Sequence, residues 1–163
     1  MAILRIRTFG DPVLRERCAE VTTIDKKSAK LVKDLVETLY HATGLGLSAN
    51  QVGVVERLFV FDVGEGPVAC FNPEILYESE ENEEEEEGCL SLPNVQIPIS
   101  RPAVMDIEFT DLKGVRKRLR GEGLMARLFR HEMDHLDGRL LLERATRENR
   151  ILAMKVLNGE TPE

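Results

Sequence analysis

The stretch FRHEMDHLDG, residues 129–138, carries two histidines four positions apart, with a glutamate directly after the first. On an α-helix, positions i and i+4 lie on one face, one above the other. His131 and His135 can therefore grip one metal ion, and the carboxylate of Glu132 can handle a proton beside them. The pattern predicts a metal-bearing helix, and it also requires a third ligand from another part of the chain.

The predicted helix extends backwards from this motif to about Gly123 and ends near Leu136, with Gly138 as its stop. Leu124 and Leu128 continue the histidine face, since they precede His131 at helical spacing. The other expected elements are a helix over 25–40 begun by Asp25, a hairpin of strands 57–63 and 67–73, a hairpin of strands 104–111 and 115–121, and a short last helix after Thr146.

Composition places the chain among ordinary globular proteins. Its 163 residues are 42% apolar and 31% charged, which predicts one domain with a real core. The net charge of −7 argues against an extended nucleic-acid surface, and the basic segment 115–121 fits a solvent-facing strand. No apolar run approaches the ~18 residues of a membrane span, and the N-terminus is too short and too charged for a signal peptide. Three cysteines without a secretion signal then predict a reducing cytoplasm.

One segment has low complexity: ESEENEEEEEG, residues 78–88. A run of like charges is typical of a solvated, mobile stretch, and we expect this for Glu78 through Glu86. A regulatory or cation-binding role is the alternative. Because the run ends directly at GCLSLP, its last glutamate can belong to a different part of the protein.

Cys89 is the strongest candidate for the third ligand. It follows Gly88 in a non-helical segment, where glycine lets the backbone approach a metal closely. A thiolate and two imidazoles leave the fourth position of a tetrahedral site open for water, as in a catalytic centre. His41 lies at a helix end without metal-site spacing, Cys18 lies in a polar stretch, and Cys70 alternates within an expected strand. A lone cysteine is more often a small buried hydrophobe, and a bare His-Glu-x-x-His also occurs on exposed helices.

Three stretches taken together resemble the motifs of one family, the peptide deformylases: GLGLSANQVG (44–53), EGCLSLP (87–93) and HEMDH (131–135). The opening RIRTFGDPVLRERCAEV is also similar to that family, and the resemblance extends to about Arg144. It implies an α+β fold with antiparallel strands packed around a central metal-bearing α-helix, an N-terminal helix and a short C-terminal helix. It further implies that residues 1–163 form a single catalytic domain.

The resemblance also implies roles for individual residues. Metal ligands would be Cys89, His131 and His135, and Glu132 would be the general acid/base. Gln51 and the backbone N–H of Leu90 would stabilise the oxyanion, Gly46 would offer backbone hydrogen bonds to the substrate, and Glu87 would be structural. The substrate methionine needs an apolar pocket, for which Leu45, Leu124 and Leu128 are the candidates; plain core packing is the alternative for Leu124 and Leu128.

The implied reaction removes the N-formyl group from the formyl-methionine of newly made polypeptides and releases formate. One divalent metal ion per chain, Fe(II) or else Zn(II), Ni(II) or Co(II), would activate a bound water, and Glu132 would move its proton. The expected partners are formyl-methionyl nascent peptides at the ribosome exit, in the cytoplasm, with no membrane and no sequence-specific nucleic acid. A zinc endopeptidase and a non-catalytic binding module are the rival interpretations. The first would use a third His or Glu ligand, and the intact Glu132 argues against the second.

Two departures from the family pattern stand near these motifs. Ser48, Ala49 and Asn50 precede the glutamine where the family often has Ala-Ala-Pro, and Arg130 stands where glutamine usually precedes the first histidine. We expect these changes to affect hydrogen bonding and fine specificity rather than activity.

Overall fold

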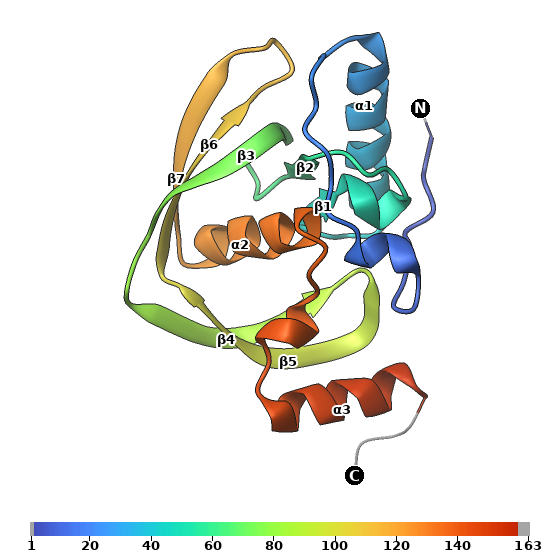
Figure 1. The fold of residues 1–163 in the computed structure, drawn as a ribbon, viewed down its shortest axis with the longest axis vertical. Helices are drawn as coiled ribbons and strands as arrows, with labels where there is room; N and C mark the ends of the chain where they lie inside the picture. Colours follow the sequence, from blue (N-terminus) through green and yellow to red (C-terminus); the bar gives the residue numbers. More distant parts are fainter. Residues whose placement is uncertain (1, 160–163) are drawn as a thin grey trace.

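The computed structural model describes residues 2–159 of the chain (Figure 1). Three α-helices are present in this part: α1 (Lys26–His41), α2 (Leu124–Leu136) and α3 (Arg147–Leu157). Its strands are β1 (Gly46–Ser48), β2 (Leu58–Phe61), β3 (Val68–Glu78), β4 (Asn82–Cys89), β5 (Leu92–Pro102), β6 (Val104–Thr110) and β7 (Arg116–Glu122). Short 3-10 helices are η1 (Pro12–Arg15), η2 (Ala49–Val52) and η3 (Leu141–Arg144).

The strands form two antiparallel sheets. Five strands pair in the order β1-β2-β3-β6-β7, and β4 pairs with β5 in a separate two-stranded sheet. Helix α2 lies between the two sheets, whereas α3 lies on the outer side of β5 (Figure 1). The α+β class with antiparallel strands is therefore confirmed, with one helix before the sheets and a short one at the end.

The two longer helices begin and end where their sequences predict. Asp25 caps α1, because its carboxylate accepts hydrogen bonds from the backbone N–H groups of Lys27 and Ser28. The backbone N–H of Asp25 in turn donates to the hydroxyl of Ser28, which completes a capping box. Helix α2 ends at Leu136, and the chain turns away at Gly138, whose φ is +74°. A Cβ there would lie 2.5 Å from the carbonyl oxygen of Arg15, so glycine is required both by the turn and by the close approach.

Helix α2 is anchored to the five-stranded sheet by its apolar side. Phe129 is fully buried and meets Phe61 edge-to-face, with ring centroids 5.6 Å apart. Residues packed in the same cluster include Phe59, Met105, Ile107, Phe109 and Met133. A second cluster joins β5 to η3 and α3. Because the first cluster holds one side of α2, the side with His131 is left to face strand β4.

The acidic run was expected to be a solvated, mobile stretch; its side chains are solvated, but most of the run lies in a strand that the sequence did not predict. Residues 82–89 form strand β4, and Glu83 to Glu86 stay exposed while their backbones pair with β5. Pairing satisfies the backbone groups, and exposure keeps the carboxylates hydrated, so a strand can tolerate this charge. The last member of the run differs as the sequence suggested: Glu87 is buried.

Both predicted hairpins are present, although β3 is longer than expected and runs on to Glu78. Strand β5 and the short strand β1 were not predicted. Cys70 is fully buried as expected, and Cys18 is buried too, despite its polar neighbours in sequence. Within residues 2–159, none of the helices combines the length and the apolar character needed to cross a membrane.

Candidate metal centre

Three side chains from two elements converge at the end of β4. Sγ of Cys89 lies 3.2 Å from Nε2 of His135, which in turn lies 3.2 Å from Nε2 of His131. All three atoms lie within 4.8 Å of one another. His41, the other candidate histidine, is exposed at the end of α1 and is not part of this group.

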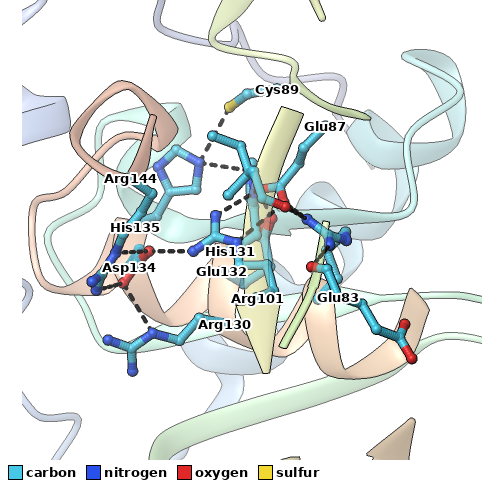
Figure 2. Close-up of polar contacts among 12 residues, drawn as sticks. Glu83, Glu87, Cys89, Arg101, Arg130, His131, Glu132, Asp134, His135 and Arg144 are labelled. Carbon is cyan, nitrogen blue, oxygen red and sulfur yellow. Dashed lines mark hydrogen bonds and ion pairs between the residues drawn. The ribbon is translucent and has the colours of Figure 1, made fainter. Parts of the chain in front are cut away.

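Glu87 determines which ring nitrogen of His131 faces the cluster. Its carboxylate oxygen Oε1 accepts a hydrogen bond from Nδ1 of His131, so Nε2 points toward Cys89 and His135 (Figure 2). A ligating histidine commonly donates its second ring N–H to a carboxylate in this way, which fixes both tautomer and orientation. Nδ1 of His135 has no hydrogen-bond partner among the described residues, so no hydrogen bond at that nitrogen orients the ring.

Glu87 belongs to a network of buried charges. Arg101 binds it through Nη2 at 2.6 Å and Nε at 3.1 Å, and also reaches Asp134 through Nη1 at 2.8 Å. Asp134 then accepts two hydrogen bonds from Arg144, at 2.9 and 3.1 Å (Figure 2). Isolated buried charges are costly, and this pairing compensates them. Arg130, which stands where the family usually has glutamine, forms ion pairs with Asp134 and Glu78 at the edge of this network.

Glu132 lies beside the cluster of Cys89, His131 and His135 without being part of it. Its side chain is buried, Oε1 is 3.9 Å from Nε2 of His131, and Oε2 has no hydrogen-bond partner within the described chain. Gly46 packs against it: a Cβ at that position would lie 3.2 Å from the carboxyl carbon of Glu132. The carboxylate is therefore close to the cluster and retains a free acceptor.

Gln51 presents its amide nitrogen to the site. Ser48 donates its backbone N–H to Oε1 of Gln51 at 3.0 Å, and because that N–H can only donate, the amide oxygen must face it. Nε2 then lies 3.0 Å from Oγ of Ser91 and 3.7 Å from Sγ of Cys89. Asn50 donates to the carbonyl of His135. Ser48 and Asn50, which depart from the family pattern, are both buried. Ser48 orients Gln51, and Asn50 binds the backbone of α2.

A pocket of about 440 Å³ opens onto the cluster. Its lining includes most of the residues singled out in the sequence, namely Leu45, Gly46, Gln51, Glu87, Cys89, Leu90, Leu124, Leu128, His131 and Glu132. Leu124 is 58% exposed and so lies at the rim, which excludes core packing as its main role. Leu128 is only 6% exposed and belongs to both the core and the pocket wall.

Burial and charge act in opposite directions on the acids of the site. Burial by itself raises the pKa of the Cys89 thiol, but the adjacent rings of His135 and His131 bring that pKa well below its ordinary value. Burial raises the pKa of Glu132, although the two histidines oppose the shift. The pKa of Glu87 is lowered despite burial, because His131 and Arg101 bind its anion. The site therefore favours a thiolate next to a carboxyl group that can hold a proton.

Sequence reasoning missed most of the supporting residues. Arg101 and Arg127 are 2% and 7% exposed, and Asp134 is 2% exposed. Nothing in the local sequence distinguishes the two arginines from surface charges, since their partners lie on other elements. Asp134 did carry a signal, because it stands inside HEMDH, between the two histidines.

One soft sulfur and two imidazole nitrogens suit a borderline divalent transition metal such as zinc or ferrous iron. Their convergence, with the two Nε2 atoms 3.2 Å apart and a buried free carboxylate oxygen alongside, fits such an ion. An α+β fold with this cluster and a buried glutamate beside it has the parts of a metal-dependent hydrolase.

Comparisons with known proteins identify the kind of hydrolase. The family model of polypeptide deformylase matches residues 3–150. The peptide deformylase of Thermotoga maritima is 46% identical over 153 residues, which cover 94% of this chain and 93% of that protein. A crystal structure of a peptide deformylase from Legionella pneumophila has a TM-score of 0.93 at 34% identity and covers 97% of this chain and 95% of that one. A peptide deformylase from Synechococcus elongatus, in complex with actinonin, has a TM-score of 0.92 at 34% identity and covers 99% of this chain and 88% of that one.

This chain belongs to the peptide deformylase family. It is a metal-dependent hydrolase that removes the N-formyl group from the N-terminal formyl-methionine of newly made polypeptides and releases formate.

Proposed function

We propose that Cys89, His131 and His135 hold the catalytic metal and that Glu132 is the general acid/base of deformylation. The observation that carries this proposal is the convergence of the three candidate ligand atoms within 4.8 Å, next to Oε2 of Glu132, for which residues 2–159 offer no hydrogen-bond partner. A divalent ion bound there supplies a Lewis acid that makes water nucleophilic near neutral pH.

Glu132 moves the proton. Its Oε2 accepts a proton from the attacking water and then delivers it to the departing amine. The raised pKa of the buried carboxyl supports this role, because a general acid/base works best when its pKa approaches the working pH. Gly46 keeps space for the carboxylate, since any side chain there would press on it.

The oxyanion that forms on the formyl group is stabilised by Nε2 of Gln51 and by the backbone N–H of Leu90. The amide of Gln51 is already oriented by Ser48, so it needs no reorganisation when charge develops. Losing one preorganised donor of this kind typically costs about 3–4 kcal/mol of activation free energy.

The methionine side chain of the substrate enters the pocket beside the cluster. Leu45 and Leu124 are half-exposed at its mouth, and Leu128 forms part of its buried wall. Gly46, on the short strand β1, offers backbone hydrogen bonds to the extended substrate peptide.

We further propose Fe(II) as the resident metal, with Zn(II), Ni(II) or Co(II) able to replace it. The nascent peptides are met at the ribosome exit in the cytoplasm, and residues 1–163 act as one catalytic domain. The thiolate and imidazole donor set is compatible with all four metals, and Fe(II) is the one that the family resemblance implies.

The deciding experiment is a deformylation assay on formyl-Met-Ala-Ser under anaerobic conditions, with bound metal quantified in the same sample. Activity should follow metal content and should disappear in the Cys89→Ala protein. Full metal content in that variant would show that the ligand assignment is wrong.

A further inference from the structure

Arg127 is a buried charge for which the proposed roles do not account. It lies on α2 exactly one i, i+4 step before His131, and it lines the pocket between Leu124 and Leu128. Its exposed fraction is 7%, so its charge must be compensated within the protein.

The guanidinium of Arg127 joins α2 to both strands of the second sheet. Nη1 donates to Oε2 of Glu87 at 2.8 Å and to the carbonyl of Ile99 on β5 at 2.8 Å. Nη2 donates to the carbonyl of Glu83 on β4 at 2.8 Å. Arg127 thus reaches β4 and β5 from the same helix that carries His131.

Glu87 is shared among three partners. Oε2 receives Arg127 and Nε of Arg101, while Oε1 receives Nη2 of Arg101 and Nδ1 of His131. Among the deeply buried members of this network, the cations Arg101 and Arg127 balance the anions Glu87 and Asp134. Without Arg127, the carboxylate that holds His131 would lose one donor and carry uncompensated charge.

We propose that Arg127 is a positioning residue, which through Glu87 fixes the ring of His131 and holds the Cys89-bearing strand β4 at its distance from α2. This inference rests on the proposed metal ligands, because it concerns how they are held. Arg127 lines the pocket, and its guanidinium is engaged by Glu87 and by two backbone carbonyls of the second sheet.

A purely structural role is the alternative, in which Arg127 only stabilises the packing of α2 against the second sheet. The two roles differ in what they change. A structural residue alters the free energy of unfolding, whereas a positioning residue also alters metal affinity and the hydrogen bond at Nδ1 of His131. Substrate affinity should change little in either case, provided that the replacement keeps the pocket wall.

Arg127→Met is the informative variant, because methionine keeps an unbranched apolar stem and removes the donors. Arg127→Lys keeps the charge without the planar fork. Arg120→Met is the matched control. Arg120 is exposed on β7 and makes a two-point ion pair with Asp106 of the neighbouring strand β6. Three quantities are measured: zinc affinity of the metal-free protein by competition with a chromophoric chelator, the ¹⁵N-NMR signal of His131 Nδ1–H, and kcat and KM.

Arg127→Met should lose about 10- to 100-fold in zinc affinity, as is typical when the partner of a metal ligand is disturbed. It should shift the His131 Nδ1–H signal and lower kcat while KM stays near the wild-type value. Arg127→Lys should recover part of the affinity, and Arg120→Met should match the wild type. In combination with Glu87→Gln, Arg127→Met should add little, because both act through one carboxylate.

Wild-type zinc affinity and an unshifted His131 signal in Arg127→Met would overturn the proposal. If that variant does not fold, Arg127→Lys decides: wild-type affinity there overturns the proposal, and a reduced affinity with an intact fold supports it. Cys89→Ala, measured in parallel, separates the two levels. Metal retained in Cys89→Ala rejects the ligand assignment itself, whereas metal lost there but unchanged in the Arg127 variants rejects only the role of Arg127.

Discussion

Nε2 of His135 lies 3.2 Å from Sγ of Cys89, although the first residue is on helix α2 and the second ends strand β4. This contact is one of those that link the two sheets, because α2 is anchored to the five-stranded sheet and β4 belongs to the other. The structure thereby brings together the cysteine and the histidines that the sequence proposed as ligands.

Cys89→Ala should lose tight metal binding, whereas Cys18→Ala and Cys70→Ala should keep it. Only Cys89 lies near the histidines, and the other two thiols are buried in or beside the core. The measurement is metal content after dialysis against a mild chelator. Equal metal content in all three variants would refute the assignment of Cys89.

Glu132→Gln should keep the metal and lose turnover by about 10²- to 10⁴-fold, the usual contribution of a general acid/base. The reason is that Glu132 lies beside the cluster and its Oε2 has no hydrogen-bond partner in the described part of the chain. Metal content and kcat are measured on one sample, with Glu122→Gln on exposed β7 as the control. A near-normal rate would exclude the proton-transfer role, and lost metal would instead make Glu132 a ligand.

Gly46→Ala should lower kcat by about 10- to 100-fold while metal content stays unchanged. The added Cβ would lie 3.2 Å from Cγ and Cδ of Glu132, so the carboxylate must shift by a few tenths of an ångström. In the Glu132→Gln background the same change should cost much less, since the group it displaces no longer transfers a proton. Full additivity of the two changes would point to an effect on the substrate instead.

The iron-loaded enzyme should start fast and decay in air, whereas the nickel-loaded enzyme should remain steady. Ferrous iron and a cysteine thiolate can be oxidised, and nickel removes the first of these routes. Activity is followed over time in air and under nitrogen, with and without catalase. Equal decay of the iron form under nitrogen would indicate simple metal loss rather than redox chemistry.

Stability should fall between about pH 9 and 11, in part because of Cys18. Burial raises the pKa of its thiol from 9.0 to about 11. The native pKa is the higher one, so the native state binds this proton more tightly than the unfolded state. The resulting stabilisation, about 2–3 kcal/mol, is complete below the unfolded pKa and is lost as pH rises through the native pKa.

The measurement is urea unfolding of the wild type and Cys18→Ala at pH 8 and pH 10.5. The variant should lose less stability between the two pH values, and Cys70, whose pKa is also raised by burial, is present in both proteins. An identical pH dependence in the two proteins would contradict the shift at Cys18.

Local features of the sequence were sufficient for the helices and the hairpins. These elements depend on signals that act over a few residues, so they can be predicted without knowledge of the fold. Examples are the cap at Asp25, the glycine turn at Gly138 and the alternation in 104–111. The donor atoms of the cluster could also be predicted, because HEMDH contains two imidazoles at helical spacing and EGCLSLP contains a thiol.

Tertiary structure alone decided how that cluster is supported. The acidic run became a strand because β5 supplied its backbone partners, and its last glutamate became buried because Arg101 and Arg127 approach it from β5 and α2. A buried carboxylate is stable only when the fold also buries its cationic partners next to it. Arg101 and Arg127 stand 14 and 40 positions away from Glu87 in the sequence. Such pairing has no local signature in the sequence, which is why the donor atoms could be predicted and the residues that hold them could not.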